Sequence, residues 1–185
     1  MFRSITASIQ QSLSQKHPPI ILIVGLRQTG KSTLARSLIT NSPSQLFNFD
    51  LISDQTEFLN QNRHTLAEFA RRYAQHTIII DEVQKCPEAT NIIKHLYDQY
   101  HLRFLLTGSS ELKITKHIGD SLAGRIKQYK LYPLSLKETL VQRDALSEST
   151  PNPTYDLCQP IISSYLVYGS LPKLENISID DYTSH

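Results

Sequence analysis

Eight residues near the start of the chain place glycine, lysine and serine at fixed spacing. The run Gly25-Leu26-Arg27-Gln28-Thr29-Gly30-Lys31-Ser32 has glycine at its first and sixth places and ends in lysine and serine. Glycine lets a backbone curl so that successive N–H groups face an anion, and a helix starting there adds the positive end of its dipole. An ammonium group and a hydroxyl at the end of such a loop suit a phosphate chain and its Mg²⁺ ion. We therefore predict a loop that binds a nucleotide by its phosphates.

Each side chain at the end of this loop has an expected part. Lys31 is expected to reach the β- and γ-phosphates, and the Ser32 hydroxyl to take one coordination place on Mg²⁺. The alternative is a chance match in a glycine-containing turn, which the apolar run before the loop and the helical pattern after it disfavour. The residues expected to contact the nucleotide are Gly25, Leu26, Arg27, Gln28, Thr29, Gly30, Lys31, Ser32 and Thr33.

Two carboxylates, Asp81 and Glu82, follow the apolar run Thr77-Ile78-Ile79-Ile80. Consecutive β-type residues of this kind predict a strand buried on both faces, as in a parallel sheet. Beside a phosphate loop, we expect Asp81 to hold Mg²⁺ through its water shell. Glu82 is then expected to orient and deprotonate the water that attacks the γ-phosphate. The alternative is an acidic turn after a core strand.

Two further positions are candidates for contact with the γ-phosphate. The apolar run 102–106 ends in a hydroxyl-rich tip, which in a sheet of parallel strands would lie near the γ-phosphate. Ser109 or Thr107 could sense the phosphate there by a hydrogen bond; a glycine turn that caps the next helix is the alternative. Arg125 precedes the last predicted strand, and a guanidinium can stabilise the charge that spreads during phosphoryl transfer. A surface salt bridge explains that arginine equally well.

The rest of the pattern supplies elements that would position these residues. Predicted strands cover residues 20–24, 45–50, 77–80, 102–106 and 126–132. Predicted helices cover residues 2–11, 33–39, 65–73, 87–100, 133–141 and 161–168, with a capping box at Thr65 and Glu68 and an irregular helical stretch at 112–123. Residues 51–63 have no clear pattern, and 142–160 read as a linker. We predict a core over residues 1–141, including the N-terminal helix, and a linker with a partial C-terminal helical region over 142–185.

Composition limits the class of protein. The chain has 185 residues, of which 39% are hydrophobic and 19% charged, which is typical of a globular domain of ordinary size. It lacks an apolar run long enough to span a membrane and a secretory signal, so we expect a cytoplasmic protein without membrane contact. Cys86 and Cys158 are expected to be buried thiols. Basic residues outnumber acidic ones over 101–137, which indicates either a solvated face or contact with nucleic acid.

Taken together, these motifs resemble those of the AAA+-type P-loop ATPases of bacteria and archaea. The resemblance rests on the phosphate loop, on Ile80-Asp81-Glu82-Val83-Gln84, and on three later runs. These runs are Arg103 to Ser110, Ser121-Leu122-Ala123-Gly124-Arg125 and Tyr132-Pro133-Leu134-Ser135, with Tyr168-Gly169-Ser170-Leu171-Pro172 beyond them. It implies a P-loop NTPase fold, three-layer α/β/α, with a mainly parallel five-stranded sheet of order 5-1-4-3-2. It also implies ATP as the nucleotide, Ser109 as the sensor and Arg125 as an arginine finger, acting in cis or across a subunit contact.

The leading hypothesis is Mg²⁺-dependent hydrolysis of ATP that drives a conformational switch, with Lys31, Ser32, Asp81 and Glu82 carrying the chemistry. A homo-oligomer and a DNA or protein partner are left open, because similar proteins often continue into a C-terminal domain thought to bind DNA or protein. A second hypothesis is a nucleotide-binding regulatory or interaction module with little turnover. A third is a small-molecule phosphotransferase, which would need an acceptor pocket that the sequence does not identify.

Overall fold

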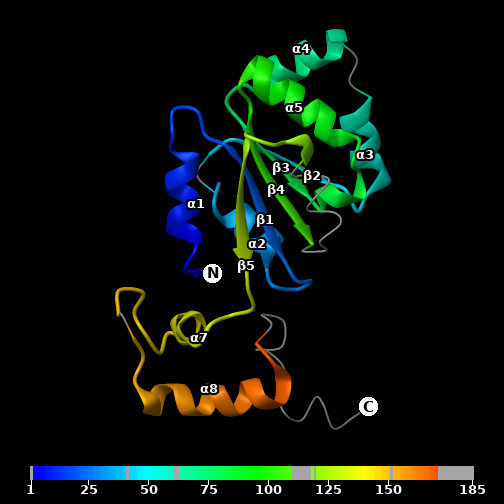
Figure 1. Ribbon diagram of the computed structural model, residues 1–185. Helices are drawn as coiled ribbons and strands as arrows, with labels where there is room; N and C mark the ends of the chain where they lie inside the picture. The colour runs from blue at the N-terminus through cyan, green and yellow to red at the C-terminus, as the bar shows by residue number, and fades with distance from the viewer. Residues whose placement is uncertain are drawn as a thin grey trace.

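A computed structural model describes residues 2–40, 42–60, 63–109, 118, 120–150 and 152–170. Its centre is a five-stranded sheet of order β2-β3-β4-β1-β5 (Figure 1). The strands are β1 (Ile20–Gly25), β2 (Ser44–Asn48), β3 (Thr77–Asp81), β4 (Arg103–Ser109) and β5 (Ile126–Leu131). Every pairing among these strands is parallel. The predicted α/β/α class and the strand order 5-1-4-3-2 are therefore confirmed.

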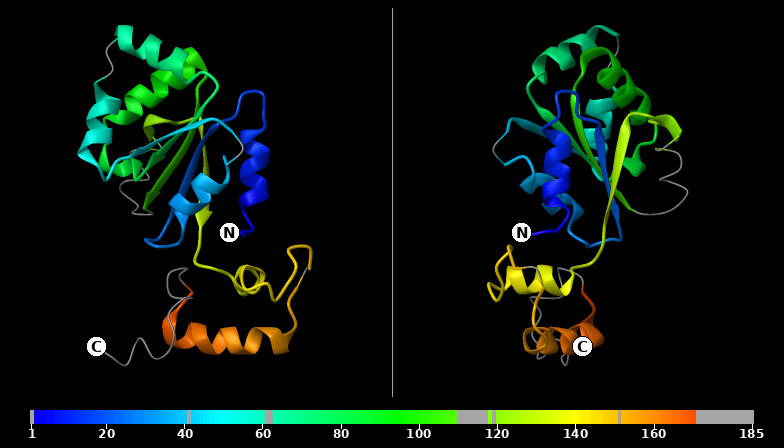
Figure 2. Two further views of the ribbon diagram at one scale, coloured as in Figure 1. Left: turned by 180° about the vertical axis from the view of Figure 1, so that it is seen from behind. Right: turned by 60° about the vertical axis from the view of Figure 1, so that its left-hand side comes forward.

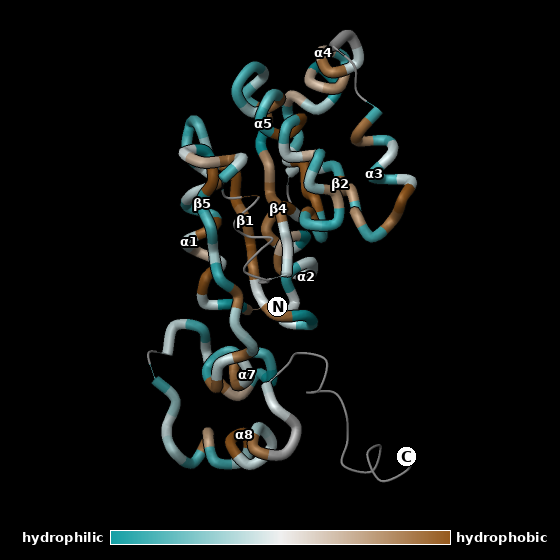
Figure 3. The backbone as a smooth tube through the Cα atoms, turned by 45° about the vertical axis from the view of Figure 1, so that its right-hand side comes forward, coloured by the Kyte–Doolittle hydropathy of each residue, from teal (hydrophilic) through white to brown (hydrophobic). Residues whose placement is uncertain are grey.

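The central strands are buried on both faces because their side chains alternate between two separate cores. Ile20, Leu22 and Val24 of β1 belong to one buried cluster. Ile21 and Ile23 belong to the other. A strand that feeds two cores needs apolar residues at consecutive positions, which is the pattern that predicted it. The edge strand β5 differs, because its Lys127, Gln128 and Lys130 positions are exposed, and Figure 3 shows teal along it where β1 is brown.

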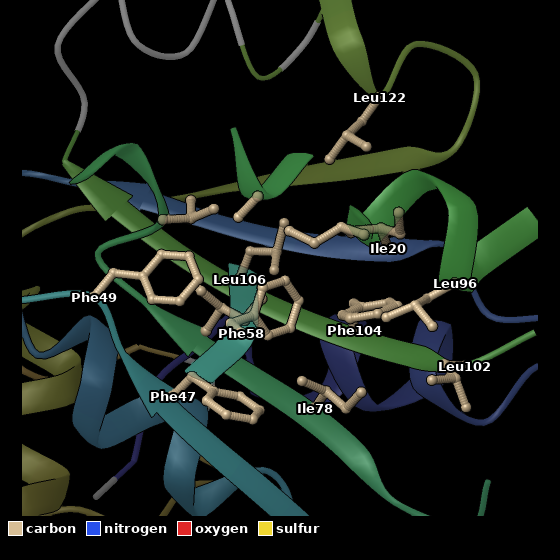
Figure 4. Close-up of a cluster of buried hydrophobic side chains, with 14 of the residues drawn as sticks. Ile20, Phe47, Phe49, Phe58, Ile78, Leu96, Leu102, Phe104, Leu106 and Leu122 are labelled. Carbon is tan, nitrogen blue, oxygen red and sulfur yellow. The ribbon is translucent and has the colours of Figure 1, made fainter. Parts of the chain in front are cut away.

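Helices cover each face of the sheet (Figures 1 and 2). One face packs against α3 (Ile52–Leu59), α4 (Arg63–Arg72) and α5 (Ala89–Tyr100). The other face packs against α1 (Thr6–Leu13) and α2 (Lys31–Ser37). The larger core is rich in aromatic rings: Phe58 packs edge-on against Phe47 and Phe49, with ring centroids 5.3 Å and 5.7 Å apart (Figure 4). A short 3-10 turn, η1 (Val83–Lys85), joins β3 to α5.

Two helices, α7 (Leu136–Gln142) and α8 (Tyr155–Tyr168), lie beyond the carboxyl end of β5 (Figures 1 and 2). They pack on each other through a small cluster of their own, which includes Leu140, Cys158 and Ile161. Ser135 caps α7 in a full capping box with Glu138. Cys86 and Cys158 are buried free thiols, as expected.

The structure corrects three local predictions. Helix α3 occupies residues that had no assignment, and α4 begins at Arg63, so Thr65 lies inside the helix and the predicted capping box is wrong. Helix α8 begins at Tyr155, inside the predicted linker 142–160. Most of the expected helical stretch 112–123 lies outside the described residues. The division of the chain after residue 141 stays a prediction, and α7 ends beside it with α8 as its packing partner.

Candidate nucleotide-binding site

The phosphate loop runs from the end of β1 to the first turn of α2. Gly30 caps α2 with φ 88° and ψ 24°, and Gln28 has φ 64°, so the loop turns through two left-handed residues. Glycine adopts that conformation without steric cost, which explains its place before Lys31. The Thr29 hydroxyl donates to the Leu26 carbonyl at 2.9 Å and closes the turn from inside. The residues predicted to cradle phosphate therefore form a compact loop at a helix start.

Gly25 is fixed by its surroundings as well as by the loop. A Cβ at this position would collide with the backbone carbonyl oxygen of Leu131 and lie 3.1 Å from Thr29 Oγ1. Gly25 is paired with Ser109 on one side and Leu131 on the other. The first residue of the loop is thus held between two strands, with no room for a side chain.

Lys31 lies under the loop rather than in solvent, with 5% of its surface exposed. Its ammonium Nζ donates to the Gly25 carbonyl at 3.1 Å and to the Leu26 carbonyl at 2.8 Å. Burial lowers the pKa of Lys31 from its ordinary value, while the nearby carboxylates of Glu82 and Asp81 raise it and Arg27 lowers it. The lysine is therefore held at the loop by carbonyl oxygens, with both acidic groups close enough to influence it.

The acidic strand end meets the start of α2 at one point. The Ser32 hydroxyl donates to Asp81 Oδ1 at 2.8 Å, across 49 positions of sequence. The Thr107 hydroxyl donates to the same carboxylate oxygen and accepts the Glu82 N–H at 3.2 Å. A hydroxyl and a carboxylate oxygen side by side are the ligand types that Mg²⁺ takes from proteins. Among the described residues no group of three or more His, Cys, Asp or Glu side chains could hold a metal, and Mg²⁺ needs fewer because it keeps several waters.

Glu82 sits at the edge of this cluster in an unusual backbone conformation. Its φ is 55° and ψ 45°, in the left-handed region that a residue with a side chain seldom adopts. The amide of Gln84 donates to Glu82 Oε2. Gln84 ends the run Ile80-Asp81-Glu82-Val83-Gln84, but the sequence analysis assigned it no role; its position two residues after Glu82 was the available signal.

Ser109, the predicted sensor, is buried at the carboxyl end of β4, opposite Gly25. It therefore lies beside the loop, as its place at a strand end predicted. The hydroxyl that contacts the acidic pair belongs to Thr107, the second of the two residues named for this role. Thr107 and Ser109 share one face of β4, and the register explains the difference: Ile80 pairs with Leu106, so Thr107 is level with Asp81 and Ser109 lies two residues beyond it.

Arg125 is not brought to the phosphate loop. It precedes β5, so it lies at the amino end of the sheet, where its carbonyl accepts the Ile20 N–H at 2.8 Å. The loop is at the opposite end of β1, about 16 Å away at 3.3 Å per residue. Its guanidinium holds Asp98 on α5 with two bonds, of 2.7 Å and 2.8 Å. This corrects the expectation of an arginine finger acting in cis: within the chain Arg125 forms the salt bridge that was the rival explanation, and a role across a subunit contact stays a prediction.

Asp98 and Arg125 stabilise each other's charged form. The hydrogen bond that Asp98 accepts from Arg125 lowers the pKa of Asp98, and the same bond raises the pKa of Arg125. The two residues join the end of α5 to the start of β5.

Comparison with known proteins decides the family. Residues 17–140 match the family model described as AAA domain, which is more than half of the chain. The chain belongs to this AAA domain family. The match covers the phosphate loop, the acidic pair, β4, β5 and most of α7.

The AAA domain has relatives in distant microorganisms. A protein of Mycobacterium tuberculosis described as uncharacterised is 28% identical over 138 residues, which is 74% of this chain and 30% of that protein. One of Haemophilus influenzae, also described as uncharacterised, is 26% identical over 177 residues, covering 90% of this chain and 43% of that protein. The chain thus spans less than half the length of these relatives.

A solved structure shares the fold. The Walker-type ATPase PABY2304 of Pyrococcus abyssi superposes with a TM-score of 0.59 at 17% identity, over 90% of this chain and 63% of that one. The family and the fold support a nucleotide-binding function of the ATPase type. Among the described residues, no helix combines the length and apolar character needed to cross a membrane.

Proposed function

We propose that this AAA domain binds ATP with Mg²⁺ and hydrolyses it to ADP and phosphate. The observation that carries the proposal is the 2.8 Å contact between Ser32 Oγ and Asp81 Oδ1. It joins the start of α2 to the end of β3, so the phosphate loop and the acidic pair act on one point in space. A triphosphate seated in the loop would meet both.

The loop and the start of α2 would hold the phosphates. Backbone N–H groups of residues 25–33 would face the phosphate oxygens, and Lys31 would neutralise the β- and γ-phosphates from a position that its carbonyl contacts already limit. Ser32 and Asp81 would hold Mg²⁺, directly and through water. The ion, when bound, offsets the negative charge of the phosphates.

Glu82 would act as the general base. Its carboxylate would accept a proton from the water that attacks the γ-phosphate in line, while the bond to the β-phosphate breaks and ADP leaves. Thr107, bound to Asp81 and to the Glu82 N–H, would keep the two acidic residues in register. Ser109 lies beside the loop, where it would sense the γ-phosphate.

A route from this site to the helices beyond β5 supports a conformational switch. Gly25 is packed against the Leu131 carbonyl at the end of β5, and α7 follows five residues later. A change in the loop between ATP and ADP states would press on that carbonyl and shift the start of α7. A DNA or protein partner would then respond to the nucleotide state through the helices at this end of the molecule. The chain would act in this way as part of a homo-oligomer.

Lys31→Ala and Glu82→Gln test the proposal together. Lys31→Ala removes the cation under the loop, so ATP binding should fall below detection. Glu82→Gln keeps the shape and the metal ligands, so ATP should still bind while phosphate release falls by about 100-fold or more. Binding is measured with a fluorescent ATP analogue and turnover by phosphate release. Turnover by Glu82→Gln equal to that of the parent chain would refute the role of Glu82.

The position of Arg125 favours a second candidate, a nucleotide-dependent interaction module with slow turnover. Its guanidinium is engaged by Asp98 at the far end of the sheet, so this arginine does not accelerate transfer within the chain. A single-turnover assay separates the two candidates: the ATPase releases phosphate on mixing with Mg²⁺, and the module retains ATP. Running the assay across protein concentration, with and without DNA, tests the oligomer and the DNA partner.

A further inference from the structure

The side chain of Gln84 forms a hydrogen bond with the carboxylate of Glu82, two residues earlier in the chain. Its amide Nε2 donates to Glu82 Oε2 from the 3-10 turn η1. One carboxylate oxygen is thereby engaged, and among the described residues no side-chain hydrogen bond occupies Oε1. A base that accepts a proton from water needs one free oxygen in a fixed direction, and this contact provides that arrangement.

The Glu82 carboxylate lies close enough to the phosphate loop for its charge to act on Lys31. The charge of Glu82 is the strongest of the charged neighbours that raise the pKa of Lys31, ahead of that of Asp81. Lys31 nevertheless donates to the loop carbonyls of Gly25 and Leu26. Lys31 and Glu82 are thus held by different partners, Lys31 by the loop carbonyls and Glu82 by Gln84.

Gly108 supplies the room in which Gln84 lies. A Cβ on Gly108 would lie 2.7 Å from Gln84 Oε1 and 3.7 Å from Val83 Cγ1. Gly108 lies in β4 without a positive φ, so no backbone requirement demands glycine there. The first atom that an added Cβ would meet is the amide oxygen of Gln84, at the end of a flexible side chain that would have to move.

The arrangement around Gln84 and Glu82 costs stability. Gln84 Oε1 is buried without a hydrogen-bond partner among the described residues, and such an orphaned acceptor is expensive. Glu82 carries a left-handed backbone in addition. Strain and unpaired polar atoms that gather at one point are typical of working sites.

We propose that Gln84 is a positioning residue that fixes the direction of the Glu82 carboxylate toward the attacking water, and that the absence of a side chain at Gly108 leaves room for it. The inference rests on the proposed ATP hydrolysis and assigns how its general base is aimed. In the step, the water proton passes to Glu82 Oε1 as the water oxygen bonds to phosphorus and the bond to the β-phosphate oxygen breaks. The Gln84 amide keeps its proton throughout and holds Oε2.

Gln84→Met tests the role of the amide without emptying its site. Methionine has similar length and no donor, so kcat should fall by about tenfold to 100-fold while the Kd for ATP stays within about twofold. The melting temperature should hold or rise, because the unpaired oxygen is removed. A loss of folding or of ATP binding would show a structural role and overturn the proposal.

Gly108→Ala tests the same contact from the other side. The added methyl group should push Gln84 off Glu82 and lower kcat to a similar extent with ATP binding kept. In the double variant Gln84→Met, Gly108→Ala, kcat should equal that of Gln84→Met alone, because the hydrogen bond between residue 84 and Glu82 is already lost. Additive losses in the double variant would overturn the link between the two residues.

The parent chain keeps the two levels of inference apart. If it binds ATP but releases no phosphate in a single turnover, the proposed hydrolysis fails and the role of Gln84 fails with it. If it turns over and Gln84→Met matches its kcat, only the role of Gln84 is overturned.

Discussion

Gly25 serves the sheet and the phosphate loop at once. It ends β1 and begins the loop, and the Leu131 carbonyl oxygen lies where its Cβ would be. Because the obstacle is backbone on a neighbouring strand, it cannot rotate away as a side chain would. The requirement for glycine at this position is therefore steric as well as functional.

Gly25→Ala should accordingly destabilise the protein and weaken ATP binding together. We expect a loss of about 3 kcal/mol in the free energy of unfolding, as in overpacked cores. Gly124→Ala is the matched control: Gly124 has φ +76° and nothing within 4 Å of an added Cβ, so only the left-handed backbone costs energy, about 1 kcal/mol. Urea denaturation measures the free energy of unfolding of the two variants. Equal losses in Gly25→Ala and Gly124→Ala would contradict the steric argument.

The placement of single residues was predictable wherever a strand end located it. Ser32 and Asp81 meet, with Lys31 beside them under the loop, since a loop after one strand and an acidic pair after another lie at the same edge of a parallel sheet. Arg125 was misjudged although the same rule applied: it precedes its strand, so it must lie at the other edge. Gln84 could not be assigned from sequence, because its contact depends on the left-handed turn at Glu82.

At the scale of elements, burial decided what could be predicted. Strands β1, β3 and β4 are apolar along most of their length and were found within three residues of their ends. Helix α3 was missed because Phe58 is its one buried residue, so its sequence shows little periodicity. Helix α8 was begun too late, since Pro160 lies inside it and indicated a linker.

The salt bridge between α5 and β5 gives a prediction at this scale. Arg125→Ala should leave ATP turnover per chain unchanged in dilute protein and lower the melting temperature slightly, less so in high salt. Asp98→Ala should give the same small change, with no further loss in the double variant. Because Arg125 lowers the pKa of Asp98, the stabilisation is complete above the ordinary Asp value of 3.8 and is lost as pH falls through the lowered pKa.

The outcome in concentrated protein addresses the remaining role of Arg125. If turnover of the parent chain rises steeply with concentration and that of Arg125→Ala does not, the arginine acts across a subunit contact. A fall in turnover of Arg125→Ala in dilute protein would contradict the placement of this residue away from the site.

At the scale of the whole molecule, the N-terminal segment ties the α7 and α8 pair to the sheet domain. Arg3 is 2% exposed and donates to the Tyr132 carbonyl, between β5 and α7. Glu138, on α7, accepts the Ser4 N–H at 2.8 Å and lies 3.6 Å from Arg3 Nε. These N-terminal residues, which we call the N-terminal strap, therefore contact the segment between β5 and α7. A structural change that starts at Gly25 would have to pass through this segment to reach α7.

Glu138→Gln should weaken this joint. The substitution keeps the size of the side chain but removes the carboxylate charge that lies 3.6 Å from Arg3 Nε, and breaking one half of a buried pair typically costs about 3 kcal/mol or more. Hydrogen exchange should show faster opening of α7 and α8, and ATP should then alter exchange in the loop but no longer in those helices. Glu148→Gln, at an exposed position, is the control that should change neither. Unchanged coupling between ATP and α7 in Glu138→Gln would mean that the nucleotide signal reaches the helices through β5 alone, without the N-terminal strap.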